Sequence, residues 1–166
     1  EPTYTNGCNE GDALVAFRFN NTQLSQGSGC SAGGYRSFTA VSATVVAGQS
    51  YPFSGTFSST TEQEGVVIWI DFNRNNTFET SERVFQTTSV VTAGISGSVV
   101  IPVGTAPGTL RMRVMVVYNT ASPNNPCGAY QYGETEDYLL TVPGAVCASM
   151  YSVKTGDWTD PTVWSC

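Results

Sequence analysis

Residues 110–118 read L-R-M-R-V-M-V-V-Y and show the two-residue alternation of a β-strand. One face of this predicted strand carries Leu110, Met112, Val114, Val116 and Tyr118, and the other face carries Arg111, Arg113, Met115 and Val117. A Gly108-Thr109 turn precedes the strand, and a loop rich in Asn, Pro and Gly follows it over residues 119–133. The stretch therefore predicts the longest strand of the protein, bounded by turn residues on both sides.

Shorter strand-like runs separated by turn residues fill most of the remaining sequence, and none has helical periodicity. We expect these strands at residues 13–20, 35–40, 43–46, 51–58, 66–70, 84–88, 98–101 and 138–142. Many short strands at near-regular spacing predict an all-β fold, an antiparallel β-sandwich of the immunoglobulin-like or jelly-roll type with disulfide-bonded loops. We expect the sandwich to span residues 1–143 and residues 144–166 to form an appendage or the start of a following repeat.

The composition excludes several functional classes. Seven basic and thirteen acidic residues give a net charge of -6, which disfavours nucleic acids and anionic membranes as partners and suits divalent cations. The chain has no histidine, so the common Ser-His-Asp and Cys-His sites and His-ligated zinc are absent, and we expect no enzyme. No apolar run approaches the length of a membrane span, and no signal peptide is evident.

Residues 71–82 read D-F-N-R-N-N-T-F-E-T-S-E and have the ligand spacing of a calcium loop. Oxygen-bearing side chains occupy the first, third, fifth, seventh and twelfth places, which are Asp71, Asn73, Asn75, Thr77 and Glu82. The sixth place needs a sharp turn, and Asn76 tolerates a left-handed backbone. The alternative is a solvated turn rich in Asp and Asn. Asn75 in place of Asp lowers the charge of the loop and predicts weak binding.

Glu134, Glu136 and Asp137 place three carboxylates within four residues. Like charges at this spacing repel unless a cation or an arginine neutralises them. They are candidates to complete the calcium shell of the Asp71 loop, and the alternative is ion pairing with Arg111 and Arg113. Paired carboxylates also serve glycoside hydrolysis, but nothing else in the sequence supports catalysis.

Tyrosines gather around the loop of residues 119–133. Tyr118, Tyr130 and Tyr132 are weak candidates for a sugar-stacking platform, and the favoured alternative is that their rings pack and their hydroxyls hold the loop.

The five cysteines, Cys8, Cys30, Cys127, Cys147 and Cys166, contain no C-x-x-C pair and lie in loop-like surroundings. Such cysteines indicate disulfides and an oxidising compartment, and the odd count leaves one thiol over.

Three segments in order resemble the GEVED domain family. They are V-I-W-I-D-F-N at residues 67–73, the segment from Ile101-Pro102 to L-R-M-R-V at residues 110–114, and C-G-A-Y-Q-Y-G-E-T-E-D-Y at residues 127–138. The last contains the family signature with Thr135 in place of Val. The N-terminal Cys8, Cys30 and Gly33-Gly34-Tyr35 also fit. The resemblance implies a non-catalytic β-sandwich module of secreted or surface-attached bacterial proteins, in which Cys8 pairs with Cys30, Cys147 pairs with Cys166, and Cys127 is left unpaired or intermolecular.

The expected function is therefore that of an extracellular, calcium-stabilised adhesion or binding module whose partner is a polysaccharide or a protein surface. Two alternatives remain open. One is a structural subunit of an extracellular fibre that contacts copies of itself, and the other is a carbohydrate-binding accessory domain of a secreted hydrolase.

Overall fold

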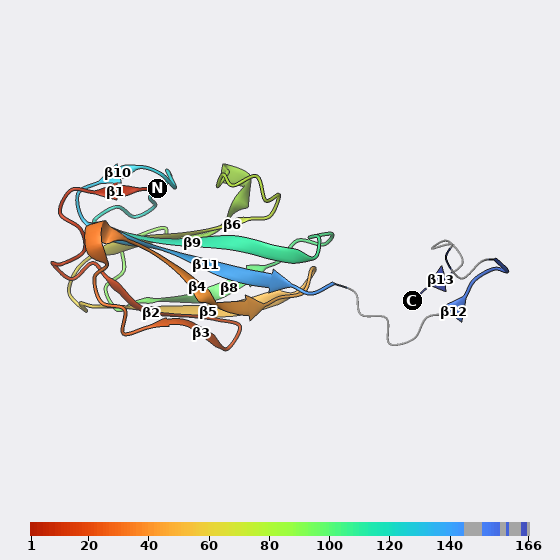
Figure 1. The fold of residues 1–166 in the computed structure, drawn as a ribbon. Coiled ribbons are helices and arrows are strands. Elements are labelled where there is room, and N and C mark those ends of the chain that lie inside the picture. Colours follow the sequence, from red (N-terminus) through yellow and green to blue (C-terminus); the bar gives the residue numbers. More distant parts are fainter. Residues whose placement is uncertain (145–150, 157–158, 160–163, 166) are drawn as a thin grey trace.

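The computed structural model describes residues 1–144, 151–156, 159 and 164–165, and in it two β-sheets stack face to face (Figure 1). The five-stranded sheet contains, in spatial order, β4 (Tyr35–Thr44), β11 (Gly133–Val142), β9 (Gly108–Tyr118), β6 (Glu64–Asp71) and β7 (Arg83–Gln86). The four-stranded sheet contains β3 (Thr22–Gln26), β2 (Leu14–Phe19), β5 (Ser50–Phe57) and β8 (Ile95–Val100). The β-sandwich is thereby confirmed.

Two two-stranded sheets and two single-turn helices complete the described part. Strand β1 (Thr3–Tyr4) pairs with β10 (Ala129–Tyr130), β12 (Tyr151–Ser152) pairs with β13 (Trp164–Ser165), and 3-10 turns cover Ala32–Gly34 and Thr80–Glu82. Strands β1, β3 and β10 lie outside the predicted strands, because their short segments are too polar to show an apolar alternation.

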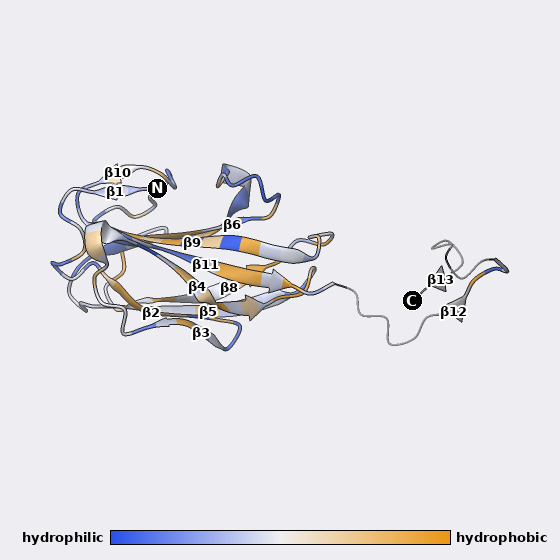
Figure 2. Ribbon diagram, in the orientation of Figure 1, coloured by the Kyte–Doolittle hydropathy of each residue, from blue (hydrophilic) through white to orange (hydrophobic). Residues whose placement is uncertain are grey.

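The core lies between the two sheets. Alternate residues of β9 and β11 face it, and Figure 2 shows the apolar stretches of these strands. An aromatic stack crosses the interface, with the rings of Phe17 and Tyr138 5.2 Å apart and those of Phe38 and Tyr138 5.5 Å apart. Burying aromatic rings of this size contributes a large share of the hydrophobic stabilisation of such a sandwich.

Strand β6 is buried along its whole length, which explains its nearly unbroken apolar sequence. Val66, Ile68 and Ile70 face the main core. Val67 and Trp69 face the other way and join a second apolar cluster with Tyr4, Phe78, Met115, Val117 and Tyr130. The N-terminal segment and the loops therefore cover the outer face of the five-stranded sheet, where β1 and β10 lie above β6 and β9 in Figure 1.

The pairing departs from the predicted antiparallel pattern at one edge of the five-stranded sheet, because β4 runs parallel to β11, whereas β11 runs antiparallel to β9. The short β1–β10 pair is also parallel. The β4 register shifts between the Tyr138–Phe38 and Leu139–Ser42 pairs, so three residues bulge out of the ladder. This bulge explains why one strand reads in the sequence as two, at residues 35–40 and 43–46.

Candidate functional site

The loop with calcium-like spacing leaves the end of β6 and returns to the sheet at β7. Asp71 is the last residue of β6, and Glu82 ends the short 3-10 turn before β7. Asn76, at the sixth place, has a left-handed backbone with φ of 66°. The expectation that this position makes the sharp turn is therefore confirmed.

Two buried carboxylates organise the loop from its two ends. Asp71 is 2% exposed, and its oxygens accept hydrogen bonds from the main-chain N–H groups of Asn75 (3.2 Å) and Asn76 (3.1 Å). Glu82 is 4% exposed, and its Oε1 accepts hydrogen bonds from the N–H groups of Phe72 (2.9 Å) and Asn73 (3.3 Å). Both acids thus face inward, toward the main chain that they enclose.

The amide side chains at the third and fifth places also fold back over the loop. Asn73 Oδ1 accepts a hydrogen bond from Asn75 N–H at 2.9 Å, and Asn75 Oδ1 accepts one from Thr77 N–H at 2.8 Å. Their amide nitrogens donate to the two carboxylate oxygens of Glu79, at 3.3 and 2.9 Å. Glu79 occupies the ninth place of the loop, and its role did not emerge from the sequence, because the spacing pattern assigns that place no fixed side chain.

Two arginines of β9 join this loop to β11, the strand that contains the G-E-T-E-D segment at residues 133–137. Arg111 Nη2 lies 3.7 Å from Asp71 Oδ2, and Arg113 makes two 2.7 Å hydrogen bonds with Asp137. The Phe78 ring lies beneath both guanidinium groups, at 5.1 and 4.8 Å from its centroid. The pairing predicted as the alternative for this trio of carboxylates therefore holds for Asp137.

The structure does not bring Glu134 and Glu136 to the Asp71 loop, as the calcium-shell prediction requires, whereas Asp137 lines a pocket beside the loop residues Asn76 and Thr77 but is paired with Arg113. The reason is the alternation of β11, which turns Glu134 and Glu136 into the sandwich and Asp137 to the opposite face. Glu134 accepts hydrogen bonds from the N–H groups of Leu14 (2.8 Å) and Ser31 (2.7 Å). Its carboxylate therefore joins β2 to the segment after Cys30 and takes no part in the loop.

Glu136 lies deeper among the strands and is fully buried. Ser25 donates a hydrogen bond to its Oε2 at 3.1 Å, Tyr138 donates another, and Oε1 has no hydrogen-bond partner. Burial raises the pKa of Glu136 to about 7, and the nearby Glu134 carboxylate acts in the same direction. A neutral carboxyl group is consequently favoured at this position at moderately low pH.

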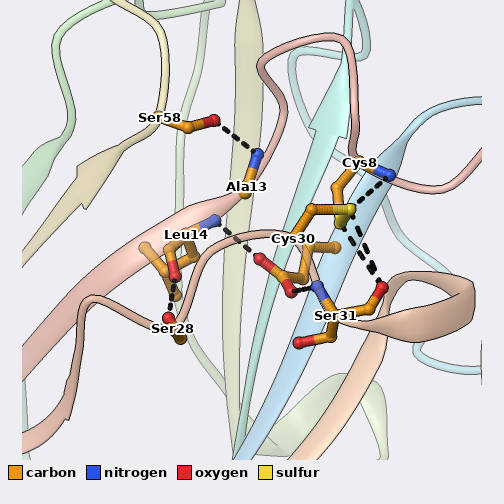
Figure 3. The surroundings of a disulfide bond; sticks show 8 residues. Cys8, Ala13, Leu14, Ser28, Cys30, Ser31 and Ser58 are labelled. Atoms are coloured by element: carbon orange, nitrogen blue, oxygen red, sulfur yellow. Dashed lines mark hydrogen bonds between the residues drawn. A yellow bond between two sulfur atoms is a disulfide. The ribbon is translucent and has the colours of Figure 1, made fainter.

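The disulfide predicted between Cys8 and Cys30 is present, and Figure 3 shows it beside Leu14 and Ser31. It fastens the N-terminal loop to the segment that Glu134 also holds. Cys127 is a free and exposed cysteine, 3.7 Å from Arg113 Nη1. The predicted Cys147–Cys166 pair lies outside the described residues.

The three candidate tyrosines separate into two kinds. Tyr130 stacks on Tyr4 with ring centroids 5.9 Å apart and donates a hydrogen bond to Asn125 O at 2.9 Å, so it packs the loop. Tyr118 and Tyr132 form an edge-to-face pair, with centroids 6.1 Å apart, that lines a surface pocket.

Within the described part of the chain, no three side chains of His, Cys, Asp or Glu gather as a metal-holding group. A calcium ion in the Asp71 loop would therefore depend on the amide oxygens of Asn73 and Asn75 and on main-chain oxygen, besides Asp71 and Glu82. Among the same residues, no helix is long and apolar enough to cross a membrane.

Comparison with protein families matches residues 65–141 to the GEVED domain, which confirms the resemblance of the signature segments. A search among curated proteins found no match. Two solved structures are distantly similar. One is a cellulose-active polysaccharide monooxygenase from M. thermophila (14% identity, 84% of this chain and 80% of that chain, TM-score 0.44). The other is an AA10 lytic polysaccharide monooxygenase from Streptomyces lividans (18% identity, 61% of this chain and 59% of that chain, TM-score 0.34). Similarity at this level carries no information about activity.

Proposed function

Because residues 65–141 form a GEVED domain, we propose that this protein acts as a non-catalytic extracellular binding module with a calcium-stabilised loop at one end of its sandwich. Its partner would be a polysaccharide or a protein surface. The disulfide between Cys8 and Cys30 supports an oxidising compartment, because such bonds persist outside the reducing cytosol.

The observation that carries the calcium proposal is the inward orientation of Asp71 and Glu82 at the two ends of one tight loop. Together with Asn73 and Asn75 they supply the side-chain oxygens that calcium prefers, and the main-chain carbonyl of Thr77 occupies the seventh place. A calcium ion can bind these oxygens together only when the loop is folded, so it stabilises the folded loop by mass action.

Limited proteolysis with trypsin tests this proposal. Trypsin cuts after arginine, and the bond between Arg74 and the exposed Asn75 lies within the loop. At a calcium concentration 100 times the dissociation constant, mass action lowers the ion-free population, and with it cleavage after Arg74, by about a hundredfold. The Asp71→Asn variant should lose this protection. Fragments identified by mass spectrometry report the site that is cut.

Glu10→Gln is the matched control, because it also replaces a carboxylate by an amide, at an exposed position outside the loop, and should keep the protection. All variants are compared in one calcium buffer, so any effect of calcium on trypsin itself cancels. Equal cleavage after Arg74 with calcium and with chelator would contradict the proposal and leave the loop as a solvated turn.

Carbohydrate binding is a second candidate, favoured by the Tyr118–Tyr132 pair. Tyr118 is 40% exposed, and the two rings line a pocket of about 240 Å³ together with carboxylates. Aromatic rings beside hydrogen-bonding acids are suited to sugar rings, which have both apolar faces and hydroxyl groups. Calorimetric titration with soluble polysaccharides tests it: a Tyr132→Ala variant should lose binding, and Tyr130→Ala should keep it if the fold is intact.

A further inference from the structure

Strand β8 forms one edge of the four-stranded sheet, and no strand of the described residues pairs with its outer side. On the inner side, next to β5, Ile101 N–H donates to Gln49 O at 2.9 Å and Ile101 O accepts from Gly48 N–H at 2.8 Å. Successive residues of an antiparallel strand direct their main-chain groups to alternate sides. The odd-numbered residues of β8 therefore bond to β5, and three even-numbered residues direct their N–H and C=O groups outward: Ser96, Ser98 and Val100.

The sequence gives this edge no protection against another chain. Residues 84–110 contain no Asp, Glu, Lys or Arg, and β8 itself, I-S-G-S-V-V, contains no proline. Its register with β5 has no bulge, and its outward residues are exposed, with Val100 at 62%. Open strand edges are templates for pairing, and proteins usually blunt them with charge, proline or a bulge. Strand β8 is therefore suited to strand addition.

The other three sheet edges of the described part carry such protection. Strand β7 is only four residues long and begins at Arg83. Strand β4 carries Arg36 and the bulge that follows Phe38. Strand β3 lies beside β4, and the Gln23 side chain donates to the main-chain oxygen of Ser25. When two copies of the chain meet, β8 is consequently the open and uncharged edge that each copy offers.

We propose that two copies of this protein pair through β8, which joins their four-stranded sheets into one continuous sheet. The pairing is antiparallel across a two-fold axis, because the same edge then serves both copies and the contact closes. The register that pairs all three outward residues places Ser98 opposite Ser98 of the second copy, and Ser96 opposite Val100 of the second copy. These three pairs exchange about six main-chain hydrogen bonds.

Charge favours a second copy as the occupant of this edge. The chain has a net charge of -6, so most approaches of two copies bring acidic surfaces together. An approach along β8 places two uncharged segments against each other. A strand of six residues makes a smaller contact than a standard protein interface of about 1,600 Å². The dimer is therefore reversible, and its population depends on the protein concentration.

Sedimentation velocity tests the inference in a series from about 1 µM to about 1 mM protein, a range that covers weak and moderate dissociation constants. The measurements use the Cys127→Ser background with reductant, which prevents association through a disulfide. Chelator is present, so calcium takes no part. The average mass should rise with concentration from that of one chain toward that of two.

Val100→Lys should raise the dissociation constant by about tenfold or more, because it places a charged side chain at the shared edge in both copies. Val41→Lys is the matched control. It makes the same change, with the same effect on net charge, at a valine of β4 that is 43% exposed, and it should leave the dissociation constant unchanged.

Ser98→Pro removes the main-chain N–H at the two-fold axis and should also raise the dissociation constant. Proline is tolerated on an edge strand where the N–H faces outward, so the monomer should still fold. Thermal unfolding checks each variant, and Val100→Lys alone carries the test if Ser98→Pro does not fold.

Amide hydrogen exchange measured by NMR locates the contact. The N–H groups of Ser96, Ser98 and Val100 should exchange more slowly as the wild-type concentration rises, and in Val100→Lys their exchange should stay fast. A chain that is monomeric at every concentration overturns the inference and leaves β8 to a segment of a different protein. A dimer that neither variant weakens also overturns it, because its contact then lies elsewhere.

Discussion

Arg113 of β9 and Asp137 of β11 face each other across neighbouring strands and are joined by two hydrogen bonds of 2.7 Å. Both side chains are almost completely buried. Arg113 Nη1 also donates to Pro126 O at 2.6 Å, and Tyr35 donates to Asp137 at 2.9 Å. The pair therefore fixes the loop of residues 119–133 to the signature strand.

Removing one partner of this pair should be costly. Asp137→Ala leaves a buried guanidinium without its carboxylate, which lowers the free energy of unfolding by about 3–5 kcal/mol. Urea denaturation measures the change. The double variant Arg113→Met/Asp137→Ala should be destabilised by less than the sum of the single variants, because no unpaired charge remains. Additive losses would contradict the coupling.

The burial of Glu136 predicts a stability that falls as pH rises. Its pKa is raised to about 7 in the folded protein, so the folded state holds the proton more tightly than the unfolded chain does. This contribution is complete below the usual pKa of a glutamate, about 4.5, and is lost as pH rises toward 7. Glu64, with a pKa raised to about 9, extends the loss to higher pH.

Thermal unfolding in chelator across pH 4 to 9 measures this dependence. Glu136→Gln should flatten the profile between pH 4.5 and 7 and leave the part at higher pH, because glutamine does not titrate. A variant profile that runs parallel to the wild type throughout would show that Glu136 does not carry the effect.

Gly133, the first residue of the family signature, has no room for a side chain. A Cβ atom there would lie 2.2 Å from the main-chain oxygen of Val116, and φ is 143°. Gly133→Ala should therefore destabilise the protein by about 3 kcal/mol or more, since the clash is with backbone that cannot move aside. Gly27→Ala is the control, because φ is 61° but nothing lies within 4 Å, and it should cost about 1 kcal/mol.

The free thiol of Cys127 predicts covalent association under oxidising conditions. It is exposed, so two chains can approach through it. Non-reducing gel electrophoresis should show a disulfide-linked species that Cys127→Ser lacks and that reductant removes. A monomer at every stage of oxidation would argue against a fibre linked through this residue.

Much of the fold follows from local sequence. The alternation in residues 110–118 predicts β9, and the apolar run before Asp71 predicts the buried β6. The surroundings of Glu134, Glu136 and Asp137 could not be predicted in the same way, because they depend on which face of β11 each side chain occupies. Glu134 and Glu136 are hydrogen-bonded inside the sandwich by Leu14, Ser25 and Ser31, partners more than 100 positions away in the sequence.

The burial of two acids, Asp12 and Glu64, which are 1% and 0% exposed, also left no recognisable sequence signal. The two residues are 52 positions apart, and neither lies in a motif with ligand spacing. Isolated acids of this kind usually face solvent, so their burial appears only once β2 and β6 are placed in their sheets. By contrast, the Asp71 loop could be predicted from the sequence, because its oxygen-bearing side chains lie within twelve consecutive residues.

The insertion of β11 between β4 and β9 constrains how the polypeptide can be produced. β4 (residues 35–44) pairs in the five-stranded sheet with β11 (residues 133–142). That sheet therefore cannot be completed until nearly the whole sandwich has been synthesised. Until then the hydrogen-bonding edges of β4 and β9 stay open. In a growing chain β4 can therefore join its sheet only after β11 has been made, and fragments that stop short of β11 expose unpaired strand edges that favour aggregation.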